Sequence, residues 1–174
     1  LLRTVSSALV VWSDAALERG IARIGWVAYD PADNTILTSH WDVPTWLIFS
    51  FVHPSHCIGQ LEILAALMVY LTLPAVRTAE RRIFHYVDNT SAVMSLFKGY
   101  SKQSDSSRLV HIFAILQARL RFDVWWEYVP SKASIGDMPA RLDWSFLRDL
   151  GARWIPTVVL TADQYFAPLA SWLP

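Results

Sequence analysis

The chain has 174 residues, which suits one domain with room for an appendage. Lysine plus arginine and aspartate plus glutamate number 15 each, so the formal net charge is zero and no overall basic field marks a nucleic-acid binder. The most apolar run falls short of the roughly 20 residues that a membrane-spanning helix requires, and a single cysteine excludes an internal disulfide.

The composition is unusually apolar. Hydrophobic residues make up 53% and charged residues 17%, against about 25% charged in ordinary soluble domains. We therefore expect a neighbouring protein or domain to cover part of the surface. The lone Cys57 favours a reducing, intracellular compartment, cytoplasm or nucleus, with no membrane partner. Because the chain opens on Leu1, we also expect it to be a segment of a longer protein.

The first third of the chain predicts three short strands. Apolar and β-branched residues favour strands at 7–16, 22–31 and 35–44, joined by short turns. Such spacing is typical of an antiparallel meander. The segment 45–57 combines an apolar run with a proline-containing loop, and its pattern favours no single element.

From Ile58 onward helices and strands alternate. Helix formers continue to Pro74, and apolar residues on all sides predict a buried helix. The later predicted elements are a strand at 81–87, a helix at 89–98 capped by Gly99, a helix at 104–122, a strand at 123–130 and a last helix ending at Gly151. We expect residues 1–151 to form one domain and 152–174 a tail whose packing the pattern does not predict.

This order, βββ-α-β-α-α-β-α, predicts an α/β fold. Its centre is a five-stranded mixed sheet in the order 3-2-1-4-5, whose first three strands are antiparallel, with helices on both faces.

Four acidic residues occupy distinctive places. Asp14 and Asp88 fall near the ends of the first and fourth strands, Glu62 in the first turn of a buried helix, and Asp137 near the start of the last helix. Helix capping explains single acids, but Asn89 already suffices as a cap beside Asp88. Neighbouring carboxylates repel each other unless cations lie between them. Their oxygens predict a Mg²⁺ or Mn²⁺ site.

A zinc site is the less favoured alternative. His53, His56 and Cys57 lie close together in the sequence "HPSHC". A fourth ligand at suitable spacing is missing, so an ordinary loop is the favoured interpretation.

Four segments together resemble the ribonuclease H fold, specifically the ribonuclease H domains attached to retroelement reverse transcriptases. They are "WSDAA", "GQLEILAALMVYL", "YVDNTSAVMSLFKG" and "YVPSKASIGDMPARLD". The last two look most like tyrosine-recombinase-type or long-terminal-repeat retrotransposon versions. The resemblance covers residues 7 to about 150.

The resemblance implies an endonuclease that cuts the RNA strand of RNA–DNA hybrids by two-metal-ion hydrolysis. Asp14, Glu62, Asp88 and Asp137 would be both catalytic residues and metal ligands. Asp14 would bridge two Mg²⁺ ions, with Mn²⁺ as a substitute. Recognition of RNA would rest on its 2′-hydroxyl groups. A covalently linked or associated polymerase domain is the implied protein partner.

The chain departs from the family in two places. Many members carry a histidine between the last strand and last helix, where this chain has "VPSKASI". Cellular enzymes often insert a basic helix where this chain has only "GYSKQSDS". We expect weak binding of hybrid by the domain alone, through Asn89, Lys98, Lys102 and Lys132.

Two other functions stay open at this point. One is another nuclease of the same fold, of integrase or transposase type, although those typically use three acids. Exonucleases of this fold usually place a second acid two residues after the first, where this chain has Ala16. The other function is that of a domesticated, non-catalytic scaffold in a larger assembly.

Overall fold

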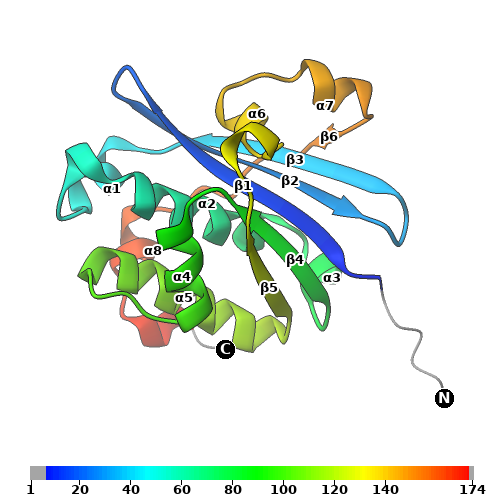
Figure 1. The fold of residues 1–174 in the computed structure, drawn as a ribbon. Coiled ribbons are helices and arrows are strands. Elements are labelled where there is room, and N and C mark those ends of the chain that lie inside the picture. The colour runs from blue at the N-terminus through cyan, green and yellow to red at the C-terminus, as the bar shows by residue number, and fades with distance from the viewer. Residues whose placement is uncertain (1–6, 173–174) are drawn as a thin grey trace.

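A computed structural model describes residues 7–172. Its centre is a six-stranded mixed sheet in the order β5-β4-β1-β2-β3-β6 (Figure 1). The strands are β1 (Leu9–Glu18), β2 (Ile21–Asp30), β3 (Thr35–Asp42), β4 (Arg82–Val87), β5 (Asp123–Tyr128) and β6 (Arg153–Trp154).

The predicted topology is confirmed for five strands. β1, β2 and β3 form the antiparallel meander, while β4 and β5 are added in parallel on the other side of β1. The number of strands was wrong, because β6 from the tail pairs in parallel with β3. A strand of two residues is too short to show the alternation by which a sequence reveals strands.

Long helices cover one face of the sheet (Figure 1). The helices are α1 (Thr45–Ser50), α2 (Ile58–Thr72), α3 (Ala75–Thr78), α4 (Thr90–Lys98), α5 (Ser104–Leu120), α6 (Asp137–Ala140), α7 (Ser145–Asp149) and α8 (Ala162–Phe166), with short 3₁₀ turns at Pro54–His56, Ser131–Ala133 and Leu169–Trp172. As predicted, α2 is surrounded: every residue from Gln60 to Tyr70 is buried. No helix within residues 7–172 is both long and apolar enough to cross a membrane.

The predicted last helix was wrong. The chain forms the two short helices α6 and α7 instead. Leu142 adopts a left-handed conformation with φ of 59°. The Asp143 N–H then bonds to the Met138 carbonyl at 2.9 Å and the Leu142 N–H to the Pro139 carbonyl at 3.2 Å. This is the Schellman arrangement that ends helices, usually built with glycine rather than leucine.

The tail beyond Gly151 reaches two sides of the molecule. β6 lies against the outer edge of β3, and α8 lies beside α5 (Figure 1). The Ser39 hydroxyl donates to the Ile155 carbonyl at 2.7 Å, and Arg108 of α5 donates to the carbonyls of Tyr165 and Ala167. The division into a domain of residues 1–151 and a separate tail stays a prediction.

A buried hydrogen-bonded chain joins the central strands to α2. His85 of β4 lies 2.8 Å from the Ser13 hydroxyl through Nε2 and 2.8 Å from the Tyr70 hydroxyl through Nδ1. His85 is fully buried. Burial favours the neutral imidazole and lowers the pKa of His85 to about 3. This chain fixes β1, β4 and α2 relative to one another one residue before Asp14.

We predict that the stability advantage of the wild type over a His85→Asn variant narrows as the pH falls from about 7 to about 4. In the unfolded chain His85 takes up a proton near pH 6.5, whereas the folded protein keeps it neutral down to about pH 3. Protonation of the unfolded state therefore costs the wild type up to about 1.4 kcal/mol per pH unit in this window. Urea unfolding at several pH values measures the difference, and a pH-independent difference would contradict the assignment.

Candidate active site

Four acids line one cavity of about 650 Å³ beside the middle of β1 and the carboxyl end of β4. They are Asp14, Glu62, Asp88 and Asp137, the set that the sequence predicts. One carboxylate oxygen from each of Asp14, Glu62 and Asp88 lies within 4.8 Å of the other two. Asp137 lies on the same cavity but outside this tight group.

The sheet register brings Asp14 and Asp88 together. β1 and β4 are parallel and their pairing ends at Ser13 and Val87, so Asp14, in the middle of β1, and Asp88, just after β4, follow at the carboxyl edge of this pair. Such an edge is where open α/β sheets place their ligands. The predicted end of the first strand near Asp14 was wrong, because β1 continues to Glu18 in its pairing with β2. Asp88 is not needed as a helix cap, because the Asn89 side chain accepts the Ala92 N–H at 3.0 Å. The predicted division of roles between Asp88 and Asn89 fits this geometry.

Glu62 enters from α2, which lies against β1. The Ala15 N–H is shared between Asp14 Oδ1 at 2.7 Å and Glu62 Oε1 at 3.2 Å. The other oxygen of Glu62, Oε2, is buried without a hydrogen-bond partner. A buried carboxylate oxygen with no donor is costly. Its position on the cavity leaves it free to bind a cation.

Burial and the repulsion between like charges disfavour the ionised forms of Asp14 and Glu62. Asp14 is 3% exposed and Glu62 is 2% exposed. Burial raises the pKa of Asp14, and the charge of Asp88 raises it further. Burial likewise raises the pKa of Glu62 well above its usual value, with the charges of Asp14 and Asp88 adding to the effect. In the described chain no lysine or arginine forms an ion pair with any of these three acids.

The residues fit a divalent metal ion. The donors are all carboxylate oxygens, which suit Mg²⁺ or Mn²⁺ better than zinc. Two further observations on residues 7–172 support a metal site. Glu62 Oε2 has no hydrogen-bond partner, and no lysine or arginine forms an ion pair with the three acids.

Asp137 reaches the cavity because α6 lies directly on the sheet. Gly25 of β2 pairs with Asp14 and faces α6. A Cβ atom at Gly25 would lie 2.7 Å from the Pro139 carbonyl carbon and would overlap the Ala140 backbone. Gly136 makes a similar approach, since a Cβ there would lie 3.0 Å from the Ser13 carbonyl carbon. Because Gly25 and Gly136 have no side chain, α6 packs closely on the sheet and Asp137 lies close to Asp14.

The four predicted nucleic-acid contacts divide into two groups. Asn89 and Lys132 line the acidic cavity. Lys98 and Lys102 line a separate cavity of about 270 Å³ at the end of α4, with Met94 and Tyr100 among its other residues. Their contact with nucleic acid stays a prediction.

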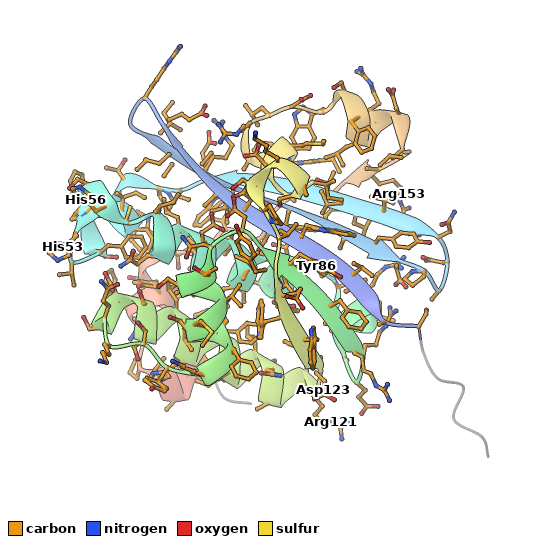
Figure 2. All side chains as sticks on the ribbon, viewed as in Figure 1. His53, His56, Tyr86, Arg121, Asp123 and Arg153 are labelled. Atoms are coloured by element: carbon orange, nitrogen blue, oxygen red, sulfur yellow. The ribbon has the colours of Figure 1, made fainter. Side chains whose placement is uncertain are left out.

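The alternative zinc site finds no geometric support. His53 and His56 are exposed beside α1 (Figure 2), whereas Cys57 is buried. Asp14, Glu62 and Asp88 form the one group of potential metal ligands found in the described part of the chain.

Two residues of the cavity wall were missed. Arg141 donates from Nε to Asp137 Oδ1 at 2.6 Å, and from Nη1 to Glu18 Oε1. The spacing of four residues between Asp137 and Arg141 was a usable signal, because such pairs meet on a helix. Glu18 lies 123 residues from Arg141 in the sequence, and no local pattern predicts that contact.

The comparisons bear on the fold. No protein-family model and no curated protein matches the chain. Among solved structures 105 chains match. Ribonuclease H1 from the halophilic archaeon Halobacterium salinarum is 16% identical, with a TM-score of 0.53, over 82% of this chain and 99% of its own.

Two further solved structures are similar with lower scores. LC11-RNase H1 in complex with RNA/DNA hybrid is 12% identical, with a TM-score of 0.48, over 73% of this chain and 88% of its own. The N-terminal ribonuclease H domain of Rv2228c from Mycobacterium tuberculosis, solved as a fusion with maltose-binding protein, is 14% identical, with a TM-score of 0.47, over 82% of this chain and 99% of its own.

The likeness to the archaeal enzyme, together with the strand order, shows that this chain has the ribonuclease H fold. At 16% identity the likeness establishes the fold alone. The predicted fold is confirmed, and the retroelement type stays a prediction.

We predict that Glu62→Gln makes the metal-free protein more stable at about pH 8, where an ordinary carboxyl group is ionised. The amide has nearly the same shape but removes a buried charge that Asp14 and Asp88 repel. Mg²⁺ should raise the melting temperature of the wild type and not that of the variant, because only the wild type keeps the full ligand set. Thermal unfolding in EDTA and in Mg²⁺ tests this.

Asp149→Asn, which removes an exposed carboxylate on α7, is the control for Glu62→Gln and should respond to Mg²⁺ like the wild type. A Glu62→Gln variant that is less stable than the wild type in EDTA would refute the electrostatic argument.

We predict that Gly25→Ala destabilises the protein by about 1–3 kcal/mol, the usual cost of overfilling a packed site. The added methyl group must push α6, and with it Asp137, away from Asp14. Gly59→Ala is the matched control, because a Cβ at Gly59 meets nothing within 4 Å. The control should change stability by less than about 1 kcal/mol. Equal stability of both variants, measured by urea unfolding, would show that α6 does not depend on this close approach.

Proposed function

We propose that this chain is a ribonuclease H, a metal-dependent endonuclease that hydrolyses the RNA strand of RNA–DNA hybrids. The observation that carries the proposal is the meeting of Asp14, Glu62 and Asp88 where the pairing of β1 with β4 ends. The fold shared with an archaeal ribonuclease H1 supports it.

Asp14, Glu62, Asp88 and Asp137 would hold Mg²⁺ in this proposal, two ions in all, with Mn²⁺ as a substitute. Bound Mg²⁺ would supply a hydroxide from water and stabilise the negative charge that develops on the phosphate and leaving oxygen. The Ala15 N–H keeps Asp14 and Glu62 in register, since it bonds to both carboxylates. Within the buried site these hydrogen bonds fix the ligand oxygens in advance, so little reorganisation is needed on binding.

Contacts to the nucleic-acid backbone would come from both sides of α4. Asn89 and Lys132 lie on the acidic cavity, and Lys98 and Lys102 on the neighbouring cavity. Phosphate contacts of this kind position a duplex without reading its sequence. Discrimination of RNA from DNA would rest on the 2′-hydroxyl groups.

We further propose that the domain works joined to, or associated with, a polymerase domain, inside the reducing interior of a cell. Several large apolar side chains are strongly exposed, among them Phe49 (72%), Val76 (85%), Phe97 (72%) and Trp125 (64%). A contiguous apolar patch marks a surface that another protein covers, and in this proposal some of these side chains belong to such a surface. A retroelement reverse transcriptase is the setting that the sequence motifs favour.

We predict that the protein cuts the RNA strand of a hybrid in Mg²⁺ and leaves double-stranded RNA and double-stranded DNA intact. Asp88→Asn should lower the rate by more than about 100-fold, because even the outer partners of metal ligands contribute about 10–100-fold. Gel analysis of end-labelled strands measures both, with Asp149→Asn as the control.

Three results would contradict the proposed function. Cutting of double-stranded DNA would favour an enzyme of the transposase class. Cutting that survives Asp88→Asn would remove the acidic site from the mechanism. Absence of cutting, even with a polymerase module attached, would favour a scaffold.

A further inference from the structure

Arg141 occupies an unusual place for a cation. It lines the same cavity as the four acids, and its guanidinium group joins two carboxylates that come from distant parts of the chain. Nε donates to Asp137 Oδ1 at 2.6 Å, and Nη1 donates to Glu18 Oε1 at the end of β1. A guanidinium group is always charged in a protein.

Asp137 needs an external support because its own element is short. α6 has four residues and ends at once in the turn around Leu142. The side chain of Asp137 is 31% exposed, unlike the buried Asp14 and Glu62. Its ion-pair partner in the described chain is Arg141, which bonds to Oδ1, and the Asp137 carboxyl group also interacts with that of Asp14. A carboxylate held by one oxygen presents the other in a fixed direction.

Glu18 gives the bridge its anchor. It lies on β1 four residues after Asp14, so it is fixed to the strand that carries the central acid. The planar guanidinium donates to Asp137 and Glu18 at once, which ties α6 to β1 through side chains. Gly25 and Gly136 determine how closely the backbone of α6 approaches the sheet. The Arg141 bridge determines the direction of the Asp137 carboxylate.

We propose that Arg141 is a positioning residue that holds the Asp137 carboxylate toward the cavity, with Glu18 as its anchor, so that Asp137 can bind metal. The inference rests on the proposed metal-dependent function. It assigns roles to two residues that the acidic set does not include.

The main rival is a counterion role, in which Arg141 only neutralises the metal-free acids. In that case its removal would strengthen metal binding, because a competing positive charge disappears. The geometry favours positioning, since the hydrogen bonds of Arg141 go to Glu18 and Asp137 and its charge reaches Asp14 only at longer range. No ion pair joins Arg141 to Asp14, Glu62 or Asp88 in the described residues.

A titration of the protein alone with Mn²⁺ tests the proposal. The electron paramagnetic resonance signal of the free ion measures how much Mn²⁺ is bound. Asp137→Asn defines the binding that depends on Asp137. We predict that Arg141→Gln weakens that binding by about 10-fold, as expected for an outer partner of a metal ligand. Glu18→Gln should weaken it less, and the double variant should match Arg141→Gln, because both residues act through one bridge.

Two comparison variants separate positioning from charge and from folding. Arg141→Lys keeps the charge but lacks the fork that holds two carboxylates, so it should also weaken binding. Arg121→Gln removes an exposed pair with Glu80 at the far end of the molecule and should bind Mn²⁺ like the wild type (Figure 2). Because exposed ion pairs add little to stability, Arg141→Gln should unfold at nearly the urea concentration of the wild type.

Unchanged or tighter Mn²⁺ binding by Arg141→Gln would overturn the proposal, and so would full rescue by Arg141→Lys. Hybrid cleavage is assayed separately on the same proteins. A wild type that binds Mn²⁺ through Asp137 but cuts no hybrid, even with a polymerase module attached, would contradict the proposed function, while the binding data would still decide the role of Arg141.

Discussion

Two carboxylates, Asp14 and Glu62, are buried side by side, and the surrounding structure must hold them together. Like charges in a water-poor site repel strongly and would move apart in a loose structure. Here each is fixed on a rigid element, Asp14 in the central strand and Glu62 in the most buried helix. The hydrogen-bonded chain through His85 joins those elements just below the acids. The fold thus holds a group that a cation can stabilise and that forms no ion pair with a lysine or arginine of the described chain.

The sequence was informative wherever the signal is local. Strand and helix patterns predicted the eight major elements of residues 7–128, and the places of the acids along them predicted that Asp14, Glu62, Asp88 and Asp137 would share one cavity. The elements after residue 130 were mostly missed, because they are short and held by distant contacts. The turn at Leu142 uses a residue that gives no sign of a left-handed conformation, and β6 has only two residues.

In the site as well, some residues could be predicted from the local sequence and others only from contacts between distant segments. Glycine at position 25 has no special backbone angle, and its purpose becomes visible only when α6 lies on it. Glu18 looks like an ordinary charge at a strand end until Arg141 reaches it. Side chains that carry chemistry were therefore found from residue type and element, whereas the groups that support them required the fold.

The path of residues 152–172 has a consequence for the sheet itself. Ile155 donates to the Thr38 carbonyl, and Thr157 donates to the His40 carbonyl, so this segment occupies the outer border of β3. An exposed strand edge has unpaired N–H and C=O groups, which can pair with another chain and lead to aggregation. Shortening the protein to its first 151 residues would uncover that border, together with the surface of α5 to which Arg108 ties Tyr165. The segment therefore covers a strand edge that would otherwise be open to pairing with another chain.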